Sequence, residues 1–273
     1  MTALPQISEQ DATPEILAIY TKIKIVSGLP MVNLIWRHFA AFPSVLDWAW
    51  NTVAPAVGST AIDLAMQRIV TSIKLPPIVP MDADGLRAAH LSDKARADIS
   101  AVVNAYTRGN LINVVALTAL RMRLEHPDRP AASLTPRMRR VSPPPAELDP
   151  LPRIDALDPH LAACICALAL HHEGADGYVI PSLYLALSYW PGLIEALPTR
   201  LSALYEPVAM RAALAQVCEL AEAEAAVMRP EFSPTPEGIS AVQPALQRFT
   251  QVLIPGAIPV CVALHRLLLD VDN

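Results

Sequence analysis

The feature that most constrains the fold is an internal repeat. When Phe42-Pro43 is aligned with Trp190-Pro191, 148 residues further along the chain (42 to 190), many other positions fall into register. The further matches are Met31-Val32 with Val179-Ile180, Trp36 with Tyr184, Asp47 with Glu195 and, at nearly the same offset, 109-GNLINVVAL-117 with 255-PGAIPVCVA-263. Two copies of one half can bury a shared interface as a symmetric dimer does. We therefore expect an internal pseudo-dimer of two helical repeats of about six helices each, with a cleft between them.

Helix signals dominate both halves. Thr13 and Gly28 mark the N-cap and the stop of one predicted helix, and Ser92 and Gly109 mark those of another. Runs of alternating β-branched residues bounded by hairpin turns are absent. The sequence therefore predicts an all-α fold.

A proline-rich stretch separates the halves. Residues 126–153 contain eight prolines, which cannot continue a helix because proline lacks the N–H and clashes with the preceding turn. The basic cluster 137-RMRR-140 lies within this stretch and is typical of a solvated linker rather than a binding arm. We expect an N-terminal repeat over 1–125, a linker over 126–153 and a C-terminal repeat over 154–273.

The composition raises the question of a membrane protein, because hydrophobic residues make up 53% and charged residues 17%. The apolar run 161–170 is half of the roughly 20 residues that a bilayer needs, and the run 254–269 contains two prolines, a histidine and an arginine. Both runs are predicted to be buried helices, and no membrane is expected. The N-terminus lacks a basic start followed by an apolar core, so the expected location is the cytoplasm.

Other classes of function are disfavoured by charge and by residue spacing. A net charge of −5 without a basic, aromatic-interleaved patch argues against nucleic acid. The four cysteines form no C-x-x-C pair and are expected to be reduced and buried. His171 and His172 diverge by about 100° on a helix, so with Glu173 they do not make a metal site.

The order of features resembles the group I 2-haloacid dehalogenases, the non-stereospecific type. The shared features are a leucine-proline step before an apolar helix, an aromatic-proline turn, a glycine-asparagine step, a proline-rich linker and a second divergent copy. This resemblance implies an all-helical pseudo-dimer with a buried pocket between its halves, no cofactor, no metal and assembly as a homodimer. It also implies hydrolysis of 2-haloalkanoic acids by an activated water that an aspartate and an asparagine hold.

The resemblance assigns two catalytic positions, of which one keeps the residue of the family and the other does not. The asparagine of the family falls on Asn110, in 106-YTRGN-110, where it would position the water. The catalytic aspartate of the family falls on Leu183. The expected substrate-binding residues are Met31, Leu34, Arg37, Ser182 and Tyr184.

Leu183 conflicts with ordinary dehalogenation. A general base contributes about 10²–10⁴-fold to the attack of water, and leucine can neither take a proton nor accept a hydrogen bond. Asp176, Arg37 and His38 are alternative polar groups for a position near Asn110. Asp176 also fits a polar loop between helices. Arg37 either grips a substrate carboxylate or extends from the helix to the surface.

Two functions therefore remain open. The first is a divergent, cofactor-independent enzyme that acts on a small hydrophobic or halogenated carboxylic acid in an apolar cleft around Asn110. The second is a non-catalytic relative that binds a small molecule or a protein partner.

Overall fold

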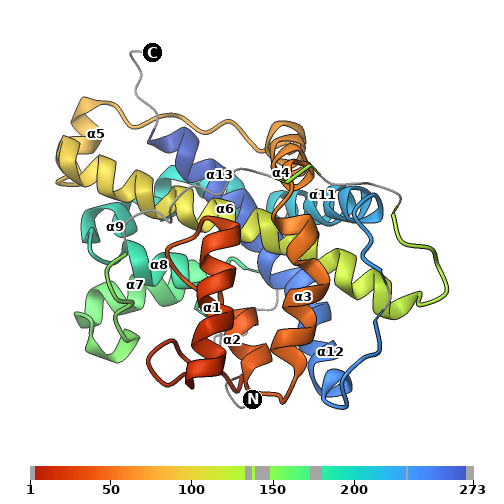
Figure 1. Ribbon diagram of the computed structural model, residues 1–273. Coiled ribbons are helices and arrows are strands. Elements are labelled where there is room, and N and C mark those ends of the chain that lie inside the picture. Colours follow the sequence, from red (N-terminus) through yellow and green to blue (C-terminus); the bar gives the residue numbers. More distant parts are fainter. Residues whose placement is uncertain (1–3, 133–136, 139–147, 173–179, 232, 269–273) are drawn as a thin grey trace. The chain divides into compact units, whose positions relative to one another are not determined.

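The computed structural model describes residues 4–132, 137–138, 148–172, 180–231 and 233–268. These residues form helices, turns and coil (Figure 1), with one isolated antiparallel bridge between Ser59 and Met138. The predicted all-α class is confirmed.

Chain contacts divide the molecule into two compact units. Unit 1 comprises Met1–Ser72, Arg108–Glu147 and Val217–Ile254, and unit 2 comprises Ile73–Thr107, Leu148–Gln216 and Pro255–Asn273. Each unit thus draws on both halves of the sequence, whereas the predicted repeats are consecutive. The repeat boundaries at 125 and 154 stay a prediction.

The helices fall into three sets. Those of unit 1 are α1 (Pro14–Ser27), α2 (Leu34–Ala40), α3 (Val45–Val57), α4 (Thr60–Ser72), α12 (Ile239–Arg248) and the π-helical turn η2 (Phe249–Leu253). Those of unit 2 are α5 (Ala83–Ala88), the 3-10 turn η1 (Ile154–Ala156), α7 (Pro159–Ala169), α8 (Ser182–Leu187), α9 (Pro191–Arg200) and α10 (Ser202–Tyr205). Those with residues assigned to both units, or beginning at the boundary, are α6 (Asp93–Glu125), α11 (Pro207–Ala226) and α13 (Ile254–Leu267).

The predicted helix starts are confirmed by their caps. Thr13 accepts a hydrogen bond from Ile16 N at the start of α1, and Gly28 ends that helix with φ of 67°, a left-handed conformation that suits glycine. Ser92 Oγ accepts from Ala95 N, 3.2 Å away, at the start of α6.

The predicted stop at Gly109 is wrong. Helix α6 continues through Gly109 to Glu125, and Figure 1 shows it as one uninterrupted helix. A glycine inside a helix costs about 1 kcal/mol relative to alanine, which is why it suggested a helix end. The packing of Asn33 against Gly109, described below, supplies the reason for a glycine at this position.

The helix bounds recur along the chain near the offset of 148 residues. Helix α2 at 34–40 corresponds to α8 at 182–187, and α4 at 60–72 corresponds to α11 at 207–226. This repeated order agrees with the predicted internal repeat, and the pseudo-dimer stays a prediction.

Each unit has its own apolar core. In unit 1 Trp36 makes edge contacts with Phe39 and Trp50, with ring centroids 5.7 and 5.6 Å apart. In unit 2 the fully buried residues include Ile99, Leu168, Tyr184, Leu187, Leu193 and Leu204.

The two apolar runs differ in burial. Most of the α13 side chains from Ile258 to Leu264 are inaccessible, as predicted. Helix α7 buries one face only: Leu161, Ile165 and Leu168 are buried whereas Cys166 is exposed. The prediction of burial is therefore wrong for Cys166 and for half of α7, because small side chains there carry the apolar pattern onto the surface.

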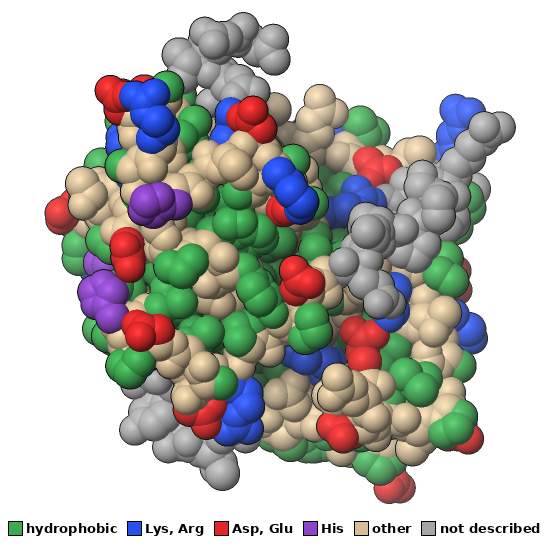
Figure 2. All heavy atoms as spheres, turned by 90° about the vertical axis from the view of Figure 1, so that its left-hand side faces the viewer, with side chains coloured by type: hydrophobic (Ala, Val, Ile, Leu, Met, Phe, Trp, Pro, Cys, Tyr) green, Lys and Arg blue, Asp and Glu red, His purple; other side chains and the backbone are tan. Residues whose placement is uncertain are grey.

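The helical run 239–267 is long and apolar enough, by length and composition alone, to cross a membrane. Within its most apolar window 67% is buried inside the protein, and core helices of folded proteins pass the same test. On the face drawn in Figure 2, Lys and Arg side chains are interspersed with Asp and Glu.

Candidate functional site

The predicted pocket residues of unit 1 lie where the chain enters α2. Met31 and Leu34 are both partly exposed, and Asn33 between them is the N-cap residue of α2. Asparagine at an N-cap normally accepts a hydrogen bond from the first helical turn. Asn33 makes no such bond, and its buried Oδ1 has no partner among the described residues.

Gly109 accounts for the position of the Asn33 amide. A Cβ at Gly109 would lie 3.1 Å from Asn33 Nδ2, 3.2 Å from Asn33 Oδ1 and 3.3 Å from Leu29 Cδ1. The amide therefore packs directly on the α6 backbone, beside the residue that precedes Asn110. Asn110 itself is partly exposed. The sequence analysis overlooked Asn33, whose only signal was a polar residue within the apolar run 30-PMVNLIW-36.

A second asparagine fixes α2 against α6. Trp36 Nε1 donates to Asn113 Oδ1 over 3.0 Å, and both side chains are buried. Asn33 contacts Gly109, and Trp36, three residues later, contacts Asn113, four residues after Gly109. These contacts hold the Met31–Leu34 segment at a fixed register on α6.

The segment before α1 also contacts the residues at the start of α2 and within it. Glu9 Oε1 accepts from the backbone N–H of Val32 at 3.1 Å, and Glu9 Oε2 pairs with Lys24 Nζ at 2.6 Å. His38 Nδ1 lies 2.7 Å from the carbonyl oxygen of Pro5 and, as the nitrogen facing an acceptor, donates to it. The chain before α1 thus positions the segment that was predicted to line the pocket.

Arg37 and His38 differ in exposure. Arg37 is partly exposed, although its Nε is buried without a partner among the described residues. His38 is only 2% exposed, and its Nε2 is likewise buried and unpartnered within the described part of the chain. A role for Arg37 in binding a carboxylate stays a prediction.

The predicted residues of unit 2 lie on α8. Ser182 is its first residue and is partly exposed, and the hydroxyl of Tyr106 donates to the Ser182 carbonyl oxygen over 3.2 Å. Leu183 is 3% exposed and Tyr184 is fully buried. Asp176 and Glu173 lie outside the described residues.

Tyr184 belongs to a buried polar network that the sequence analysis overlooked. Its hydroxyl lies 2.8 Å from His172 Nε2 and 3.2 Å from the hydroxyl of Tyr205. Burial lowers the pKa of His172 to about 4, with a smaller contribution from His171, while a hydrogen bond to the Gly256 backbone opposes the shift. His172 is therefore neutral near pH 7, so its Nε2 accepts a hydrogen bond from Tyr184. Burial also raises the pKa of both tyrosine hydroxyls.

His171 points to a different partner. Its ring stacks on Tyr205 with centroids 4.3 Å apart and planes 10° from parallel, whereas His172 binds Tyr184. Both histidines lie in the turn after α7 (Pro159–Ala169) and not on a helix, so the predicted helical divergence does not apply to them. Within the described ranges no three His, Cys, Asp or Glu side chains form a group that could hold a metal ion.

A further imidazole lies against α6 within unit 2. His265 Nε2 is 2.9 Å from Thr107 Oγ1, and the Thr107 hydroxyl lies 2.7 Å from the carbonyl oxygen of Val103. The hydroxyl proton goes to that carbonyl, so Nε2–H donates to Thr107 and Nδ1 is left as the acceptor. Burial lowers the pKa of His265 below its usual value. Thr107 precedes Asn110 by one turn of α6.

Comparison with known proteins supplies the family context. A configuration-inverting 2-haloacid dehalogenase from Alcaligenes xylosoxydans xylosoxydans is 27% identical over 203 residues, which cover 70% of this chain and 66% of the relative. The match thus spans just under two thirds of that relative's length. No protein-family profile matches the chain.

Solved structures match over nearly the whole chain. A D-2-haloacid dehalogenase mutant in complex with D-2-CPA has a TM-score of 0.80 at 18% identity, covering 98% of this chain and 96% of that one. D-2-haloacid dehalogenase in complex with L-LA also has a TM-score of 0.80 at 18% identity, covering 98% and 97%. This chain has the fold of the D-2-haloacid dehalogenases. Its sequence similarity extends to a 2-haloacid dehalogenase as well, so the resemblance inferred from the repeat is supported at the level of 2-haloacid dehalogenases.

Proposed function

We propose that the protein is a divergent 2-haloacid dehalogenase-like enzyme that hydrolyses a small hydrophobic 2-halocarboxylic acid without a cofactor. The observation that carries this proposal is the joint match in fold and sequence to 2-haloacid dehalogenases. Met31 and Leu34 would form an apolar wall, and Asn110 would orient the attacking water.

Leu183 requires a different proton acceptor from the one that the family resemblance implies. We assign this role to His265, because its pKa is lowered, its Nδ1 has no hydrogen-bond partner among the described residues and Thr107 fixes its ring. In the proposed step the water oxygen bonds to the carbon, the carbon–halogen bond breaks and the halide leaves with the electron pair. The proton of the water passes to His265 Nδ1.

The direct test is halide release by the purified protein from each enantiomer of 2-chloropropionate. Wild-type turnover that His265→Gln reduces by about 10²-fold or more supports the assignment, since that is the share of a general base. The value of kcat/KM should fall on acidification with an inflection below pH 6.5, because the protonated imidazole cannot accept a proton and its pKa is lowered. Unchanged turnover in His265→Gln would refute the role of His265.

The alternative is a non-catalytic binding protein, and the apolar, buried Leu183 favours it. Absence of turnover in wild type, with halide release in Leu183→Asp by a protein of unchanged circular dichroism, would support this alternative. Activity in that variant would also show that Leu183 occupies the position of the family's aspartate.

A further inference from the structure

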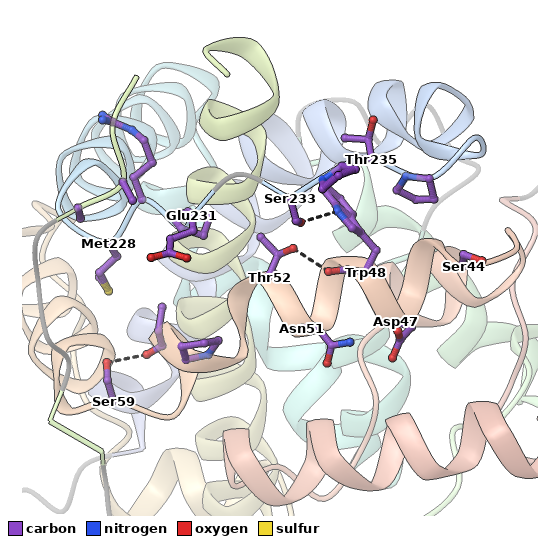
Figure 3. Close-up of a pocket in the computed structure, with 18 of the residues that line it drawn as sticks. Ser44, Asp47, Trp48, Asn51, Thr52, Ser59, Met228, Glu231, Ser233 and Thr235 are labelled. Carbon is purple, nitrogen blue, oxygen red and sulfur yellow. Dashed lines mark hydrogen bonds between the residues drawn. The ribbon is translucent and has the colours of Figure 1, made fainter. Parts of the chain in front are cut away.

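A cavity lies wholly within unit 1. Its volume is about 840 Å³, and none of the residues predicted for the haloacid site lines it. One wall is α3, with Trp48, Thr52 and Pro55, and the opposite wall is the coil after α11, with Met228 and Glu231 (Figure 3). The size is that of pockets that hold small organic molecules.

The walls of this cavity are fixed by partly buried hydrogen bonds. Trp48 Nε1 donates to Ser233 Oγ over 2.9 Å, which ties the coil to α3 (Figure 3). Arg123 is 3% exposed, and its guanidinium donates to the carbonyl oxygens of Pro230, Pro127 and Arg129 at 2.7, 3.0 and 2.6 Å. The coils on both sides of the cavity are thus held by one buried cation, so the cavity is pre-formed.

Two hydroxyls of these walls, those of Thr52 and Ser59, present acceptors to the cavity. The Thr52 hydroxyl donates to the Trp48 carbonyl oxygen, and the Ser59 hydroxyl donates to that of Ala56, each over 2.7 Å. The indole N–H of Trp48 is taken by Ser233. What these hydroxyls offer a ligand is their lone pairs.

Glu231 and Asp47 are the acidic side chains that line this cavity, and Arg229 is the basic one. Glu231 has no hydrogen bond or ion pair among the described residues, and Figure 3 shows its carboxylate directed into the space between Met228 and Thr52. Arg229 Nη1 donates to the Pro130 carbonyl oxygen, and its Nε is buried without a partner among the described residues.

We propose that this cavity binds an organic ammonium ion, a primary amine carried on an aryl or alkyl body. An ammonium group has three donors and no acceptor, which matches Glu231 and the hydroxyl lone pairs. The apolar body would lie against Trp48, Pro55 and Met228, and the indole face attracts a nearby cation. Carboxylates of the kind proposed for the haloacid site are disfavoured here by the like charge of Glu231.

Titration calorimetry with three matched probes tests this site on the full-length protein at pH 7. The probes are 4-phenylbutylamine, which is then an ammonium ion, the neutral 4-phenylbutanol and the anionic 4-phenylbutyrate. The amine should bind more tightly than the alcohol, by up to about five-fold, as expected for one exposed ion pair. Its affinity should fall as salt rises, because exposed charges are screened.

The variant Glu231→Gln should remove this preference and leave alcohol binding unchanged. Glu237→Gln is the matched control, since Glu237 is exposed on the same coil and does not line the cavity. Equal binding of the three probes, no binding of the amine at millimolar concentration, or an unchanged preference in Glu231→Gln would each overturn the proposal. None of these outcomes depends on halide release, so the test of this cavity and the test of the proposed dehalogenase activity are independent.

Discussion

Acidification should destabilise this protein through His172. The side chain is 7% exposed and hydrogen-bonded to Tyr184, and burial lowers its pKa from 6.5 to about 4. In the unfolded chain the same imidazole regains a pKa near 6.5. Between these two values the unfolded state binds a proton that the folded state does not, so the free energy of unfolding decreases as pH falls.

The magnitude follows from the size of the pKa shift. The difference between a pKa of 6.5 in the unfolded chain and about 4 in the folded protein corresponds to a loss of about 3 kcal/mol of stability. The loss begins below about pH 6.5 and is complete near pH 4, and the His172 contribution is constant above pH 7.5. Since small domains have a total stability of about 5–15 kcal/mol, this loss is large enough to measure.

The assay is urea unfolding followed by tryptophan fluorescence, at a series of pH values from 7.5 to 4. Wild type is compared with His172→Gln, which cannot titrate. The variant should be less stable at pH 7.5 because it disturbs the bond to Tyr184, but the difference from wild type should shrink by about 3 kcal/mol at pH 4. His126→Gln is the control, since His126 is exposed at the end of α6.

A constant stability difference between wild type and His172→Gln across this pH range would refute the reasoning. It would mean that the folded protein accommodates a charged His172, and that the hydrogen-bonded network with Tyr184 opens without a large penalty.

Further substitutions test the packing. Gly192→Ala should cost about 1–3 kcal/mol or more, because the new Cβ would lie 2.8 Å from the carbonyl carbon of Ala89 and closer still to its oxygen; thermal unfolding measures the loss. Gly256→Ala meets only ordinary contacts from 3.6 Å outward and should be neutral or gain up to about 1 kcal/mol, so an equal loss in both variants would contradict this explanation. Arg123→Met should cost about 3 kcal/mol in urea unfolding, because several carbonyls that accept its guanidinium bonds, Pro230 among them, lose a charged donor. Retention of wild-type stability in this variant would show that the coils are held by other contacts.

Local signals in the sequence were sufficient to predict where two of the helices start. Thr13 and Ser92 act as caps as predicted, because capping depends on a few neighbouring residues. Gly109 misled the same reasoning, since the reason for a glycine there is the close packing of Asn33, 76 positions earlier in the chain (33 to 109). Local rules contain no information about such a neighbour.

The candidate site was predicted only in part for the same reason. Asn110 and Leu183 could be singled out because the order of short motifs resembles a family, and that resemblance is written in the sequence. The network of His172, Tyr184 and Tyr205 could not, because its members approach one another only when α8 and α10 pack. The lowered pKa of His172 follows from burial, which is a property of the folded chain.

The sequence by itself determined the helical class and the repeated order of helices, because periodicity, caps and prolines act over a few residues. Only the tertiary structure decided which polar groups are left without partners and which are satisfied. Asn33 Oδ1 is buried and unpartnered, whereas Trp36 and Asn113 satisfy each other. Hydrogen bonding and burial depend on contacts between distant segments, and these contacts also form the walls of the cavity around Glu231.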